Sequence, residues 1–222
     1  MTTTLRFTRC PVSIRIPQGK LVGELLVPEN ALGIVVFAHG TGSSAASPRN
    51  KFVAEWLAGH GLASLLFDLL TIGEWDDPAR TFDIPLLSKR LVMGSDWVGT
   101  QRAIAQLPVG YFGASTGAAA ALIASTTSSR PIAAVVSRGG RPDLAGSILE
   151  RVTAPTLLLV GGNDAEVLRL NRLALARIPG IKELEIIPGA THLFPEPGAL
   201  TTVAQRAAEW FAHYFQWANH PQ

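Results

Sequence analysis

The first part of the chain alternates between apolar and polar positions. Val12, Ile14 and Ile16 are separated by polar residues, and a turn at Gly19 leads to a second apolar segment, residues 21–27. A period of two over adjacent segments is typical of strands with one face in the core and one towards water. The sequence therefore predicts an antiparallel hairpin here.

The pattern changes after this hairpin, where short and almost continuous apolar runs replace the alternation. Such runs are typical of parallel strands that helices cover on both faces. They span residues 34–38, 62–67, 109–113, 132–136, 156–160 and 184–187. Strand–helix alternation after an antiparallel start predicts one α/β domain over residues 1–222, with a mostly parallel sheet of about eight strands.

Helical segments are predicted between these strands. In the last one, apolar residues recur at helical spacing at positions 203, 207, 210, 211 and 214. The other predicted helices are residues 51–58, 84–106, 118–126 and 166–176. Ser47 and Asn50 are both candidates for the N-cap of the first helix, since both residue types are favoured there.

Composition and charge limit the class of protein. Hydrophobic residues make up 47% and charged residues 16% of the chain, which excludes a disordered protein. A net charge of +2 without a dense Lys/Arg run argues against nucleic acid as the partner. Cys10 is the only cysteine, so neither an intramolecular disulfide nor a cysteine zinc cluster can form.

No segment is typical of membrane insertion or secretion. Apolar runs fall short of the roughly 18 residues that a membrane span needs, and the N-terminus lacks the apolar region of a signal peptide. We therefore expect a cytoplasmic protein with no membrane contact.

The strongest chemical signal is Gly-Ala-Ser-Thr-Gly at residues 113–117, between an apolar strand and an alanine-rich helical segment. A G-x-S-x-G elbow needs this context, because its serine occupies a strained turn that tolerates only small neighbours. The following helix directs its N-terminus at the site and favours negative charge on a reacting oxygen. Ser115 is thus predicted to be a nucleophile; the alternative is a small-residue turn with an incidental serine.

A serine nucleophile needs a base that an acid orients. In this kind of fold the chain order is serine, acid, histidine, and His192 lies in the loop after the last strand. Asp164 lies in a glycine-rich turn at a strand end, 28 residues before His192. Asp143 is the competing acid, and helix capping is the alternative role for Asp164.

The loop after the third strand reads His-Gly-Thr-Gly at residues 39–42. In this kind of fold the loop at that place and the residue after the nucleophile each donate a backbone N–H to the oxyanion. The predicted donors are Thr41 and Thr116. A phosphate-binding loop would need a Gly-Lys-Ser/Thr sequence, which is missing, and His39 is interpreted as structural.

These motifs, in this order and spacing, resemble the α/β-hydrolase superfamily, specifically its small, dienelactone-hydrolase-like branch, over nearly the whole chain. The resemblance implies a serine hydrolase that cleaves carboxylic esters with small acyl groups through an acyl-enzyme, with no metal and no organic cofactor. Dienelactone hydrolases proper use a cysteine nucleophile, whereas this chain has Ser115. A thioesterase, lactonase, amidase or acyl transferase would use the same triad. A protein that binds a small ligand without turnover is the alternative outside enzymes.

Other residues bear on access and specificity. Lids in this fold usually follow the sixth strand, but residues 139–154 leave room for one short helix, so no cap domain is expected. Trp75, in the loop after the fourth strand, is predicted to form one wall of the site. Arg138 and Arg141 follow the strand next to the nucleophile's; either one binds an anion of the substrate, or they form a structural ion pair with Asp143.

The aromatic residues near the C-terminus leave the oligomeric state open. Trp210, Phe215 and Trp217 are compatible with a homodimer contact, but burial in the core explains Trp210 equally well.

Overall fold

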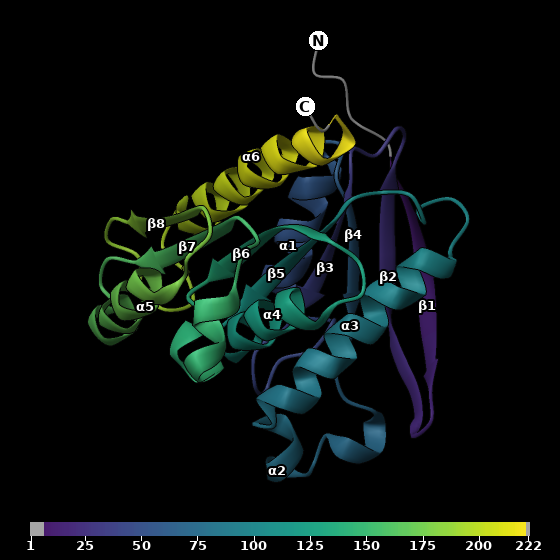
Figure 1. Cartoon of the computed structure of the whole chain (residues 1–222), viewed down its shortest axis with the longest axis horizontal. Coiled ribbons are helices and arrows are strands. Elements are labelled where there is room, and N and C mark those ends of the chain that lie inside the picture. Colours follow the sequence, from purple (N-terminus) through teal and green to yellow (C-terminus); the bar gives the residue numbers. More distant parts are fainter. Residues whose placement is uncertain (1–6, 221–222) are drawn as a thin grey trace.

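Eight strands form one mixed sheet in the computed structural model, which describes residues 7–220 (Figure 1). Their order across the sheet is β1-β2-β4-β3-β5-β6-β7-β8. The strands are β1 (Phe7–Ile16), β2 (Gly19–Pro28), β3 (Ile34–Ala38), β4 (Ala63–Phe67), β5 (Val109–Ala114), β6 (Ile132–Arg138), β7 (Thr156–Gly161) and β8 (Lys182–Ile187). The β1–β2 hairpin is antiparallel, β2 joins β4 antiparallel, and the remaining pairs are parallel, which confirms the predicted fold class.

Helices cover both faces of the sheet (Figure 1). One face carries α1 (Pro48–Ala58) and α6 (Ala199–Asn219), and the other carries α3 (Ile84–Thr100), α4 (Thr116–Thr127) and α5 (Ala165–Arg177). Three short helices complete the described chain: η1 (Ile72–Glu74), α2 (Pro78–Thr81) and η2 (Pro142–Arg151). None of the helices described for residues 7–220 is both long and apolar enough to cross a membrane.

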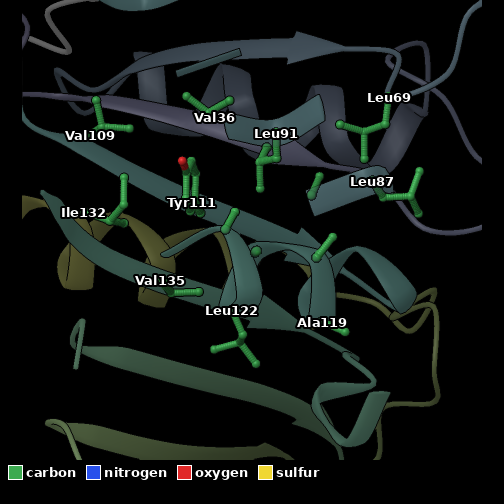
Figure 2. Close-up of a cluster of buried hydrophobic side chains, with 14 of the residues drawn as sticks. Val36, Leu69, Leu87, Leu91, Val109, Tyr111, Ala119, Leu122, Ile132 and Val135 are labelled. Carbon is green, nitrogen blue, oxygen red and sulfur yellow. The ribbon is translucent and has the colours of Figure 1, made fainter. Parts of the chain in front are cut away.

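The core has one apolar layer on each side of the sheet. Figure 2 shows the layer below α3 and α4, where Leu91 lies near the strand residues Val36 and Tyr111, and Leu122 of α4 belongs to the same buried cluster. The Tyr111 hydroxyl is buried and bonds to Ser95 Oγ at 2.8 Å, so its polar end is satisfied. Because the central strands are apolar on both faces, they appear in the sequence as continuous runs without alternation.

Helix boundaries required two corrections. The predicted helix over residues 84–106 ends at Thr100, because Gln101 takes an extended backbone conformation and the following turns carry Ile104 into the core. The first helix begins at Pro48 rather than 51, and Ser47 is its N-cap, accepting the Asn50 N–H. Between β6 and β7 the chain forms only η2, as the short gap predicted.

The C-terminal aromatic residues divide between core and surface. Phe215 is fully buried, and Trp210 donates its indole N–H to the Pro155 carbonyl. Trp217 is 63% exposed. It lines a hollow of about 700 Å³ at the amino ends of β5 and β6, remote from the strand ends that carry Ser115.

Candidate active site

Ser115 lies in a strained turn between β5 and α4. Its backbone angles are φ 51° and ψ −123°, a region that L-residues rarely occupy. Neighbouring backbone holds this conformation: Ser115 N–H donates to the Arg138 oxygen at 3.2 Å, and the Ser115 oxygen accepts the Arg141 N–H at 3.0 Å. A Cβ on Gly113 would lie 2.5 Å from Ala118 Cα, so the turn requires glycine there. The sequence prediction of an elbow at this residue agrees with the observed backbone.

His192 and Asp164 are brought together from two neighbouring loops. His192 Nδ1 lies 2.7 Å from Asp164 Oδ2. A carboxylate only accepts hydrogen bonds, so Nδ1 carries the proton and Nε2 is left as the basic nitrogen. Asn163 fixes the loops to each other, since its N–H donates to the Ala190 oxygen and its side-chain amide donates to the Gly189 oxygen, both at 2.9 Å.

The sequence left two alternatives open, Asp143 as the acid and helix capping as the role of Asp164. Asp143 accepts two hydrogen bonds from Arg141, at 2.9 and 2.8 Å. Asp164 precedes α5 as its N-cap residue, but its side chain makes no capping hydrogen bond and turns to His192 instead. Asp164 is therefore the acid that the structure places beside the histidine.

The end of β6 lies between the serine turn and the histidine loop. A Cβ on Gly139 would lie 2.9 Å from the His192 oxygen and 3.6 Å from His192 Nδ1. On the other side of the elbow, a Cβ on Gly40 would lie 3.6 Å from Ser115 Oγ. Within the described residues the His192 ring bonds to Asp164, and no hydrogen bond connects it to Ser115 Oγ. Long serine–histidine distances are common in enzymes without bound substrate.

The two predicted oxyanion donors are in contact, although not in the expected way. Thr41 N–H donates to Thr116 Oγ1 at 2.8 Å, and the two hydroxyl oxygens are 3.0 Å apart. The Thr41 hydroxyl also donates to the Thr81 oxygen at 3.1 Å. Thr116 is the first residue of α4, so its own N–H has no acceptor within the helix. A substrate oxygen would have to replace the Thr116 hydroxyl at the Thr41 amide.

Both ring nitrogens of His39 have backbone partners, and these hydrogen bonds hold the loop after β3. Its Nε2 accepts the Leu69 N–H at 3.0 Å, so Nδ1 carries the proton and donates to the Gly40 oxygen at 3.1 Å. Burial lowers the pKa of His39, which keeps the ring neutral. Trp75 lies nearly parallel to this ring, with 6.2 Å between centroids, and so borders the loop after β3; that it forms a wall of the substrate site stays a prediction.

Sequence reasoning missed Asp68, which lies directly after β4. Its carboxylate accepts the Ala45 N–H at 2.7 Å and fixes the far end of the loop between β3 and α1. A signal was present, since Asp68 follows a buried strand at the edge where the site lies, but an aspartate there has many explanations.

The arginines after β6 have different environments. Arg141 pairs with Asp143, which decides between the two interpretations for this residue. Arg138 is only 7% exposed, and its guanidinium carbon lies 5.9 Å from the centre of the Phe112 ring. Burial, together with the positive charge of Arg49, lowers the pKa of Arg138 to about 10, so it is still a cation at neutral pH.

The part of the chain that the structure describes contains no group of three or more His, Cys, Asp or Glu side chains arranged to hold a metal ion.

Comparison with known proteins gives relatives of two kinds. A solved structure of a dienelactone hydrolase from Anabaena variabilis is 54% identical, with a TM-score of 0.90, and the match covers 94% of this chain and 98% of that one. An esterase domain from Rhodothermus marinus has a TM-score of 0.76 at 17% identity, over 94% of this chain and 99% of that one, and supports the fold alone. No protein-family model matches the chain.

The second kind of relative is longer than this chain. Mycobacterium tuberculosis proteins described as a "Putative phosphoribosyl transferase" are 59% identical over 191 residues, which is 86% of this chain. The match covers 43% of their length, so this chain corresponds to less than half of those proteins.

Proposed function

Because the chain belongs to the dienelactone-hydrolase-like branch of the α/β-hydrolases, we propose that it is a serine hydrolase that cleaves carboxylic esters with small acyl groups. One observation carries the proposal: Ser115 is held in a strained elbow at the sheet edge where His192 is paired with Asp164 at 2.7 Å. Strain of this kind costs stability and is found where function requires it.

The first half of the reaction forms an acyl-enzyme. Ser115 Oγ attacks the ester carbonyl carbon while His192 Nε2 accepts the hydroxyl proton. Asp164 keeps the imidazole oriented through Nδ1 and stabilises the cation that forms. When the carbon–oxygen bond to the alcohol breaks, the same proton passes from His192 to the leaving oxygen.

The second half returns the enzyme to its starting state. Water attacks the acyl carbon while His192 accepts one of its protons, and the proton then returns to Ser115 Oγ as the acid leaves. The negative oxygen formed in each half is bound by the N–H groups of Thr41 and Thr116. No metal or organic cofactor is required for these steps.

The hollow between the loop after β3 and Trp75, which Leu87 also lines, has a volume of about 10 Å³. This is about enough for one water molecule. Ser115 and His192 do not line this hollow, so the acyl length is tested directly by the series of esters below.

A lactone is the second candidate substrate, because the Anabaena variabilis relative is described as a dienelactone hydrolase. A lactone is a cyclic ester, and the same residues would open it, with the alcohol remaining attached to the acyl group. The transferase description belongs to proteins of which this chain spans less than half. Under the proposed mechanism, the residues at the Ser115 site transfer an acyl group to water.

The test is hydrolysis of p-nitrophenyl esters, from acetate to octanoate, by the wild type and Ser115→Ala. We expect turnover of the short esters by the wild type and only background for the variant. If both proteins are inactive, labelling with a fluorophosphonate probe separates the remaining cases. Labelled Ser115 would mean an active serine with another substrate, and unlabelled Ser115 in folded protein would favour ligand binding without turnover.

A further inference from the structure

Two arginines with no acidic partner among residues 7–220 lie at the sheet edge that carries Ser115. Arg138 is the last residue of β6, and its backbone oxygen accepts the Ser115 N–H. Arg49 lies in the first turn of α1, the helix that follows the loop after β3. Arg138 Nη1 and Arg49 Nε are both buried, and neither has a hydrogen-bond partner among residues 7–220.

The two side chains lie on the same face of the sheet. Side chains alternate along a strand, and Arg138 follows Val136 by two residues, so it shares the face that α1 and α6 cover. The contact of the Arg138 guanidinium with the Phe112 ring agrees, because Phe112 packs in the same layer. Arg49 begins α1, the helix that covers this face, and its positive charge contributes to the lowered pKa of Arg138.

Such a pair is unfavourable unless something else is bound to it. A buried charge without a partner destabilises the fold, and a second cation nearby adds repulsion. Other arginines of this molecule avoid the cost: Arg90, which is buried, pairs with Glu74 at 2.9 Å, and Arg141 pairs with Asp143 at 2.8 Å. The unused donors beside Ser115 therefore indicate an anionic ligand.

We propose that Arg138 and Arg49 form a subsite for an anionic group of the ester substrate, and that this group is a phosphate-type dianion. Two cations balance two negative charges, and planar guanidinium groups donate paired hydrogen bonds to phosphoryl oxygens. The location of the subsite rests on the arginines alone, whereas the statement that the anion belongs to an ester rests on the proposed function.

The activity test uses three p-nitrophenyl esters of similar length with the same leaving group. They are the neutral butyrate, the hemisuccinate with one carboxylate, and the 3-phosphonopropionate, measured at pH 8, where the phosphonate is mostly a dianion. For the wild type we expect kcat/KM to be at least tenfold higher for the phosphonate ester than for the butyrate, with the hemisuccinate between them.

Variants test which arginines are responsible for the preference for the phosphonate ester. In Arg138→Met and Arg49→Met the ratio of phosphonate to butyrate should fall at least tenfold, and Arg138→Lys, which keeps the charge, should retain part of it. Arg141→Met is the matched control, since this arginine follows Arg138 by three residues but pairs with Asp143, and it should keep the wild-type ratio. A wild-type ratio near one, or an equal ratio in Arg138→Met, would overturn the subsite, and a preference for the hemisuccinate would overturn the dianion.

A binding measurement keeps this result separate from the proposed function. Inorganic phosphate is titrated by calorimetry into Ser115→Ala and into the double variants Ser115→Ala/Arg138→Met and Ser115→Ala/Arg141→Met. We expect at least tenfold weaker binding only when Arg138 is replaced. If every ester is inert but this pattern holds, the subsite stands and the ester hydrolase proposal fails. If the esters are hydrolysed but phosphate does not bind, the ester hydrolase proposal stands and the subsite fails. The same conclusion follows if phosphate binds equally well with and without the Arg138→Met change.

Discussion

Replacing Ser115 by glycine should make the protein more stable than replacing it by alanine, although both changes remove the hydroxyl. The backbone at Ser115 has φ 51° and ψ −123°, where a Cβ is strained and glycine is not. Alanine keeps this strain, whereas glycine removes it. The comparison of the two variants therefore measures the backbone strain and leaves out the lost hydroxyl.

The magnitude follows from two opposing terms. A residue held in a sparsely populated region costs about 1–3 kcal/mol, which glycine recovers. Glycine also gives the unfolded chain more freedom, and this disfavours folding by about 0.4–1 kcal/mol relative to alanine. Together the two terms make Ser115→Gly more stable than Ser115→Ala by up to about 2.6 kcal/mol. For a chain of this size that corresponds to a difference of up to roughly 10 °C in Tm.

Urea unfolding followed by tryptophan fluorescence measures the difference. Ser128 provides the control, because it caps the other end of α4 with φ −63°, where alanine is unstrained. At Ser128 only the entropy term remains, so the glycine variant should be the less stable one, by about 0.4–1 kcal/mol. The reasoning is refuted if the difference between glycine and alanine has the same sign at both positions.

Three further predictions concern the same loops. Asp164→Asn should lower kcat for p-nitrophenyl acetate by about 10³–10⁴-fold, because an amide no longer fixes the His192 tautomer; a loss below tenfold would contradict the assignment. Gly117→Ala should destabilise the fold by about 3 kcal/mol or more in urea unfolding, since its Cβ would lie 2.2 Å from a backbone oxygen of β3, whereas Gly73→Ala has open space and should be nearly neutral. The lowered pKa of His39 means that the folded state binds fewer protons than the unfolded state below about pH 6.5. The contribution of His39 to the free energy of unfolding should therefore be fully present above that pH and be lost as the pH decreases. His39→Gln should flatten the pH dependence of the free energy of unfolding, and an unchanged slope would contradict this prediction.

The fold could be predicted from sequence because its signals are local. The alternation around Ile14 gives the hairpin, and the unbroken apolar runs give the parallel strands. The error at Gln101 shows the limit of this approach. Apolar Ile104 continues the helical spacing but reaches the core through a turn, and spacing alone does not distinguish the two.

The candidate site also combines residues that local sequence signals predict with contacts that depend on packing. Ser115, Asp164 and His192 could be proposed from sequence because each follows a strand in a distinctive neighbourhood, and chain order in this fold relates them. The bond from the Thr41 amide to the Thr116 hydroxyl could not be predicted, because it depends on distances between loops that are 75 residues apart in sequence. The same holds for Arg49 and Arg138, whose lack of partners is a property of packing.

Under the proposed mechanism, the Thr41–Thr116 contact favours the transition state over the substrate. The Thr41 amide is already bonded to a neutral hydroxyl at 2.8 Å, so a neutral ester oxygen that displaces it gains little. The developing oxyanion gains more, since a hydrogen bond to a charged acceptor is about twice as strong as one between neutral groups. Only interactions that are stronger in the transition state accelerate the chemical step. An amide that is occupied at rest therefore contributes to kcat more than to substrate binding.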